Sequence, residues 1–143
     1  MKYEIITDRV EIDNLTEYLH YSGDNYVTPI DYNDIRTVKK ISSLKYGIKC
    51  KAECTEERID FDIIAAIKDA GINSADIKTI LLGLRFNGSD PACNLDVIYS
   101  FLDKVYGMDP EKQPVVLYAI STNPEIQVGE CHVNIVYGFD KTV

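Results

Sequence analysis

Residues 30–38 read IDYNDIRTV and carry two carboxylates, Asp31 and Asp34, three positions apart. Asp is a favoured N-cap residue because its side chain can accept a hydrogen bond from a backbone amide of the first turn. In the helix that would follow, Ile35 and Val38 fall on one side. The segment therefore predicts a loop that enters a helix at Asp31, with Asp34 in the first turn.

The clearest strand signal follows at residues 44–53, LKYGIKCKAE, where apolar residues alternate with polar residues and glycine. This period of two predicts a strand with one buried face and one solvated, lysine-rich face that carries Lys45, Lys49 and Lys51. Three further strands are predicted at residues 77–86, 115–121 and 130–139. A helix is predicted from Thr55 to about Gly71, and another from Asp90 to about Gly107.

From residue 30 onward, the order is thus helix, strand, helix, strand, helix, strand, strand. Such an order predicts an α+β fold, a two-layer α/β sandwich in which helices cover one face of a four-stranded mixed sheet. The last two strands, joined by a short turn, are expected to be an antiparallel pair. We expect one domain at residues 27–143. Residues 1–26 form an N-terminal extension in which a strand at 2–7 and a helix remain open.

Composition and charge restrict the class of partner. The chain has 143 residues, with fifteen basic and twenty-three acidic side chains and a net charge of −8. This charge disfavours binding to nucleic acids and to anionic membranes. The apolar runs are too short for a membrane span, and no secretory signal is recognisable. We therefore expect a cytoplasmic protein with reduced cysteines.

The order of elements, together with DYNDIRTV at residues 31–38, resembles the C-terminal domain of the tubulin/FtsZ superfamily, whose corresponding loop has a pattern like D-F-x-D-V-R-T-V. Weaker likenesses extend the resemblance to residues 27–141. It implies the fold of that domain. The GTPase domain of the family, with its glycine-rich phosphate loop, has no counterpart in these 143 residues, so no nucleotide cofactor is expected.

In this family the acidic loop reaches the nucleotide of the next subunit and helps to activate water. The resemblance places Asp31 and Asp34 at those carboxylates. The family's upstream asparagine and glycine are absent, since Pro29 and Tyr26 stand near their positions. We predict a partner-binding surface at Asp31, Tyr32, Asn33, Asp34 and Tyr26. The alternative is that the two carboxylates only cap the helix.

The tyrosines, cysteines and histidines point less clearly to a function. Tyr18, Tyr21, Tyr26 and Tyr32 precede or flank the acidic segment and suggest a second contact surface, or rings that cover the edge of a small core. Cys50 and Cys54 have the spacing of one half of a zinc finger, but no second close pair accompanies them. The neighbouring strand residues Cys131 and His132 should point to opposite faces and so could not share a metal. Neither histidine lies in a recognised catalytic pattern. We expect no catalytic residue, metal or cofactor.

The sequence thus favours a non-enzymatic protein-binding or regulatory module for cell division, one that docks on a tubulin-like GTPase and modulates its polymerisation. The competing interpretation is a small homo-oligomeric enzyme or ligand-binding protein that uses the same sandwich, with a pocket at a subunit interface.

Overall fold

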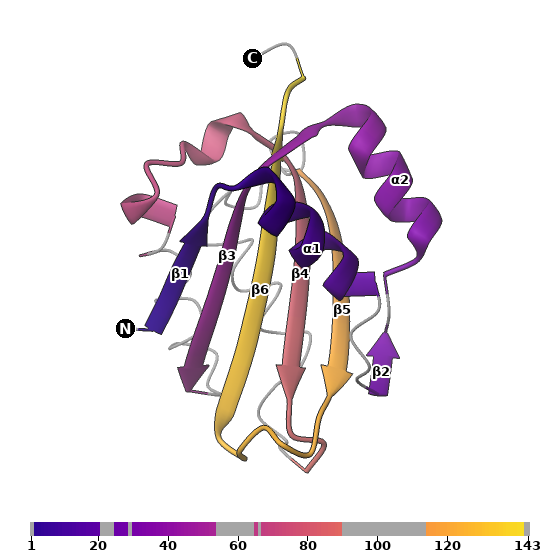
Figure 1. Cartoon of the computed structure of the whole chain (residues 1–143), viewed down its shortest axis with the longest axis vertical. Coiled ribbons are helices and arrows are strands. Elements are labelled where there is room, and N and C mark those ends of the chain that lie inside the picture. The colour runs from indigo at the N-terminus through magenta and orange to yellow at the C-terminus, as the bar shows by residue number, and fades with distance from the viewer. Residues whose placement is uncertain are drawn as a thin grey trace.

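The structure is a computed structural model and describes the backbone of residues 2–20, 25–28, 30–53, 65, 67–89 and 114–141. A single six-stranded sheet organises these residues, in the order β1-β3-β6-β4-β5-β2 (Figure 1). The strands are β1 (Lys2–Ile6), β2 (Asn25–Thr28), β3 (Ser43–Glu53), β4 (Ile77–Phe86), β5 (Val115–Thr122) and β6 (Glu130–Phe139).

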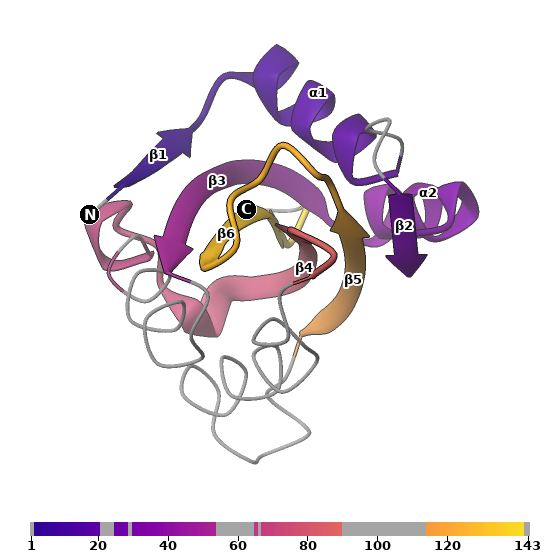
Figure 2. The same ribbon diagram turned by 90° about the horizontal axis from the view of Figure 1, so that it is seen from below.

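The helices α1 (Arg9–His20) and α2 (Tyr32–Ile41) pack on one face of this sheet. The apolar positions of α1 recur at helical spacing and are buried against Leu81 of β4 and Val136 of β6. A short 3-10 helix, η1 (Ser74–Asp76), precedes β4. Viewed along the strands, the sheet is curved and α1 lies outside it (Figure 2).

The opposite face of the sheet holds a second, larger core. It is formed by alternate residues of the central strands, and Ile67 and Ile72 join it from outside the sheet. The central strands are therefore covered on both faces, and residues 79–84 of β4 are all buried. Strands buried on both faces lose the alternation of polar and apolar residues, which explains the continuous apolar run ILLGL at residues 80–84.

Glycine allows α1 to lie close to the sheet. A Cβ atom at Gly83 would collide with the side chain of Leu19, and one at Gly47 would lie 3.0 Å from Cδ2 of Leu15. Leu15 and Leu19 are one helical turn apart, so both face the sheet. The close contact depends on these two glycines because neither carries a side chain between helix and strand.

The predicted α+β class and the four predicted strands are confirmed, and the Ile77–Phe86 and Glu130–Phe139 bounds agree with the prediction. The sheet is larger than predicted, because residues from the N-terminal extension supply β1 and part of β2. The same extension supplies α1, which packs on one face of the sheet. The prediction of helices on one face only was wrong, since α1 covers one face and Ile67, in a helical segment, joins the core of the other.

The expected pairing of the last two strands was also wrong. Strand β4 lies between β5 and β6, parallel to β5 and antiparallel to β6. The seven-residue connection from β5 to β6 passes the end of β4. Two hydrogen bonds hold it there, Asn123 N to Phe86 O at 3.0 Å and Asn87 Nδ2 to Ile126 O at 2.9 Å. A turn of this length can cross one intervening strand, since neighbouring strands are only about 4.8 Å apart.

Gly71 ends the helical segment at residues 67–69, as predicted. Its φ is +70°, and Ile72 N donates to Ile67 O at 3.2 Å. This is the pattern of a helix that ends in a left-handed residue. The remainder of the helix predicted from Thr55 and all of the one predicted after Asp90 lie outside the described residues.

Candidate functional site

The acidic segment enters α2 as the sequence predicts. Asp31 is the N-cap, and its Oδ1 accepts a hydrogen bond from Asn33 N at 2.7 Å. Its carbonyl oxygen accepts from Asp34 N at 3.0 Å and from Ile35 N at 3.2 Å. The predicted cap is confirmed. Asp31 and Asp34 are both exposed, so capping leaves the segment on the surface.

The end of α1 anchors this entry. Nδ1 of His20 donates to the carbonyl oxygen of Ile30 at 3.0 Å, since a carbonyl can only accept. The ring of His20 also lies 5.5 Å from that of Tyr32, centroid to centroid. Ile30 is buried with Ile35 in the core beneath the two helices. The acidic segment is therefore exposed while its backbone is held from both sides.

The other residues of the predicted surface are partly placed. Tyr32 is 49% exposed, and Asn33 is exposed with its carbonyl oxygen accepting from Thr37 Oγ1 at 3.0 Å. Tyr26 lies in the edge strand β2, where its backbone pairs with Ser121, and its side chain is outside what the structure describes. Asp31 to Asp34 thus form a continuous exposed surface, which we call the acidic entry.

The predicted tyrosine cluster divides. The ring of Tyr18 does not join the acidic entry. It lies under the guanidinium of Arg85, whose central carbon is 5.0 Å from the centroid of the ring. Tyr21 is outside the described residues.

The prediction that Cys131 and His132 point to opposite faces is confirmed, because Cys131 belongs to the larger core while His132 lines a cleft beside α1. Cys50 is buried in the same core as Cys131, as predicted from its apolar strand face.

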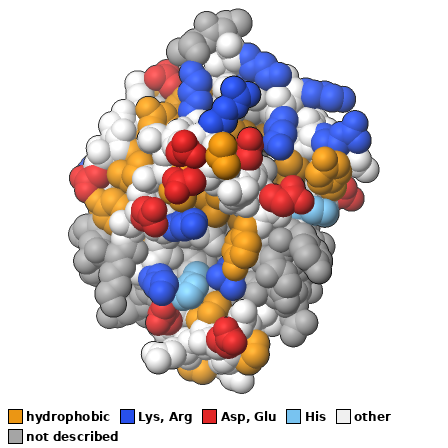
Figure 3. Space-filling model, in the orientation of Figure 1, with side chains coloured by type: hydrophobic (Ala, Val, Ile, Leu, Met, Phe, Trp, Pro, Cys, Tyr) orange, Lys and Arg blue, Asp and Glu red, His pale blue; other side chains and the backbone are white. Residues whose placement is uncertain are grey.

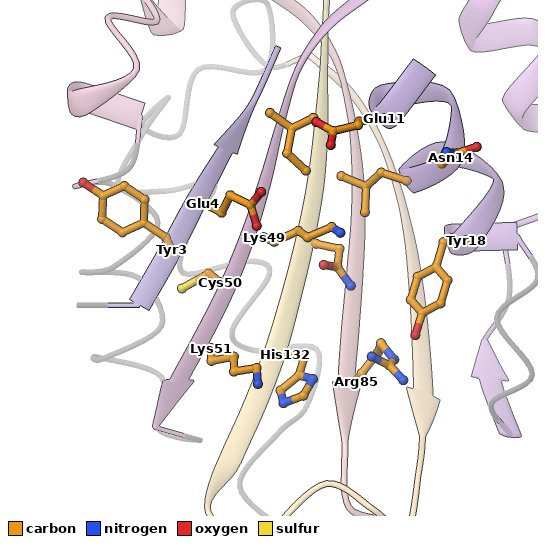
Figure 4. A pocket seen from close by; sticks show the side chains of 13 residues that line it. Tyr3, Glu4, Glu11, Asn14, Tyr18, Lys49, Cys50, Lys51, Arg85 and His132 are labelled. Carbon is orange, nitrogen blue, oxygen red and sulfur yellow. The ribbon is translucent and has the colours of Figure 1, made fainter. Parts of the chain in front are cut away.

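That cleft is the feature that sequence reasoning missed. It has a volume of about 690 Å³ and lies between α1 and the part of the sheet that α1 leaves uncovered. Figure 3 shows basic side chains and a histidine together on this face, and Figure 4 shows those that line the cleft. Its basic lining comes from Lys49, Lys51, Arg85 and His132. The alternation in residues 44–53 indicated two of these, but it predicted an open, solvated face.

A second groove, of about 890 Å³, lies where α1 begins and α2 ends, and Arg9, Lys39, Lys45 and Lys141 contribute to its lining. No described helix is both long enough and apolar enough to cross a membrane. In the described ranges no three histidine, cysteine or acidic side chains come together as a metal site would require.

No protein-family model matches the chain, and no curated protein sequence matches it. Among solved structures, an empty FtsZ dimer from M. jannaschii is similar over 93% of this chain and 37% of the FtsZ chain, with 11% identity and a TM-score of 0.60. A point mutant of M. jannaschii FtsZ is similar over 93% of this chain and 39% of its own, with 12% identity and a TM-score of 0.60.

The chain thus spans less than two fifths of the FtsZ chains that it matches. This share is consistent with a match to the C-terminal domain alone, and the predicted fold resemblance is confirmed. At this level of identity the likeness concerns the fold.

Proposed function

We propose that this chain is a non-enzymatic, protein-binding module of cell division that docks through the acidic entry on the nucleotide-bearing end of a tubulin-like GTPase in the cytoplasm. Docking would modulate or cap polymerisation, because these 143 residues offer one assembly surface of such a polymer. The observation that carries the proposal is the exposure of Asp31 and Asp34 at the start of α2 on an FtsZ-like fold.

Two features of the acidic entry support a docking role. The backbone is held by the hydrogen bond from His20 to Ile30 and by the cap at Asp31, so little conformational entropy would be lost on binding. The exposed ring of Tyr32 stands beside the two carboxylates, and tyrosine is enriched at protein interfaces. A rigid, exposed acidic surface with one aromatic side chain is suited to a basic partner surface.

The test mixes the purified chain with FtsZ and other tubulin-like GTPases of the source organism and measures GTP turnover and filament length. At stoichiometric concentration, the native chain should change one or both. The double variant D31N/D34N should lose the effect while keeping the cap, because Asn is also a good N-cap. A control, D69N, removes an exposed charge beside Ile67, which packs on the opposite face of the sheet, and should act like the native chain.

Absence of any effect with every tubulin-like GTPase would exclude this function. Loss of the effect in D69N as well would show that total charge, and not the acidic entry, is responsible.

The competing class, a ligand-binding protein, is favoured by one observation: a cleft with convergent polar groups. The residues that line that cleft all come from one copy of the chain.

A further inference from the structure

Three basic side chains stand in register across the centre of the sheet. Lys51 of β3 is paired with His132 of β6, and His132 is paired with Arg85 of β4. Residues directly opposite each other in a sheet point to the same face, and the three strands together span only about 10 Å. We call these three residues the basic row; Figure 4 shows it crossing the three strands beyond the end of α1.

The basic row is the floor of the cleft, and α1 forms one wall. Leu15 lines the cleft from α1, and Tyr18 extends from that helix toward Arg85. Two residues along the strands from the row, Lys49 of β3 is paired with Asn134 of β6. Asn134 is 7% exposed, and it also lines the cleft.

Two carboxylates also line the cleft, Glu4 of β1, which is paired with Lys49, and Glu11 of α1. Both lie toward the end of the cleft away from the basic row (Figure 4). At the basic row the cleft therefore combines a basic floor with the side chains of Leu15 and Tyr18.

The basic row places Lys51 and Arg85 on either side of His132 on one face of the sheet. Like charges directly opposite each other destabilise a sheet. The row is partly compensated, because Nε2 of His132 lies 2.9 Å from Oε1 of Glu130 and Arg85 stacks over Tyr18. Lys49 and Lys51 are exposed and form no ion pair with any residue that the structure describes.

We propose that the cleft binds a small organic phosphate, with the phosphate on the basic row and the body of the ligand against Leu15 and Tyr18. The planar guanidinium of Arg85 suits two phosphate oxygens, and its contact with Tyr18 orients it before binding. The volume lies within the usual range for small-molecule sites. The net charge of −8 disfavours large polyanions, so a local basic row selects small ones.

This site is separate from the acidic entry, and its test does not depend on docking. Isothermal titration calorimetry on the full chain would use inorganic phosphate, glycerol 3-phosphate and phenyl phosphate, with succinate as a doubly charged carboxylate for comparison. Amide chemical shifts in NMR would locate the binding site. We expect phenyl phosphate to bind more tightly than inorganic phosphate, since only its ring can contact Tyr18, and shifts should centre on Lys51, His132 and Arg85.

Single substitutions test which side chains bind the phosphate. K51Q and R85Q should each weaken phenyl phosphate binding about tenfold or more, as expected when one charge-assisted contact is lost. K78Q removes an exposed lysine of β4 that does not line the cleft, and should bind as the native chain does. K39Q and K141Q test the second groove and should leave binding unchanged.

Lys51 is exposed, so we expect K51Q to melt at the same temperature as the native chain. This measurement would verify that weaker binding by K51Q does not result from unfolding. The proposal is overturned if no phosphate compound binds at millimolar concentration, or if succinate binds more tightly than the phosphates. It is equally overturned if K39Q or K141Q, and not K51Q, weakens binding.

Discussion

Ser42 and Thr79 share a buried hydrogen bond directly over Gly138, with their hydroxyl oxygens 2.8 Å apart. Ser42 closes the end of α2, where its backbone amide and its hydroxyl both donate to the carbonyl oxygen of Val38. Thr79 is in β4 and is paired with Gly138 of β6. The bond therefore links the end of α2 to the central strands β4 and β6. It can form because Gly138 has no side chain to occupy the space of the two hydroxyl groups.

Replacing Gly138 with alanine should destabilise the protein strongly. The new Cβ would collide with the hydroxyl oxygens of both Thr79 and Ser42. Overpacking of this kind costs about 1–3 kcal/mol or more, and breaking the buried hydrogen bond adds to the cost. Urea denaturation measures the difference in the free energy of unfolding. In the matched control, G88A, the new Cβ would only touch Thr122 at 3.7 Å, so a change within about 0.5 kcal/mol is expected.

The contact of Leu19 with Gly83 should appear as a coupling between two substitutions. G83A alone should cost about 1–3 kcal/mol because the added methyl group collides with Leu19, and L19A alone about 2–5 kcal/mol because it leaves a cavity. In the double variant the methyl group enters that cavity, so the combined loss of unfolding free energy should be smaller than the sum. Simple additivity would contradict the close packing of α1 on the sheet.

Substitutions at Asp31 separate capping from charge. D31A should lose about 0.5–2 kcal/mol of stability with the cap, whereas D31N should retain most of it. D34A removes only a favourable first-turn charge, which is worth about 0.3–1 kcal/mol. Thermal unfolding of the three variants gives the ranking. A D31A protein as stable as the native one would mean that the hydrogen bond to Asn33 is not maintained in solution.

Replacement of His20 tests the anchor of the acidic entry. Asn can place an amide nitrogen near the position of Nδ1, so H20N should retain much of the hydrogen bond to Ile30, while H20L cannot. We expect H20L to lose about 0.5–1.5 kcal/mol and to exchange the amide hydrogens of the first turn of α2 faster. Hydrogen exchange followed by NMR measures both. Equal exchange in H20N and H20L would show that the ring contact with Tyr32, and not the hydrogen bond, holds the segment.

Local features were predictable because residues close in sequence determine them. The alternation at residues 130–139 was sufficient for the bounds of β6, and Asp31 with the apolar spacing of Ile35 and Val38 was sufficient for the start of α2. The opposite orientations of Cys131 and His132 follow from the same period of two. The acidic entry was therefore identified in outline from the sequence, although its anchoring by His20, ten residues before Ile30, was not.

Strand order and register depend on contacts between segments far apart in the chain, and no local period reports them. The sequence by itself determined four of the six strands, the start of α2 and the acidic charge. Only the tertiary structure decided that β4 separates β5 from β6 and that α1 covers the lysine-bearing face. For the same reason only the structure brought Lys51, His132 and Arg85 into one row, since their alignment is the product of two separate strand pairings.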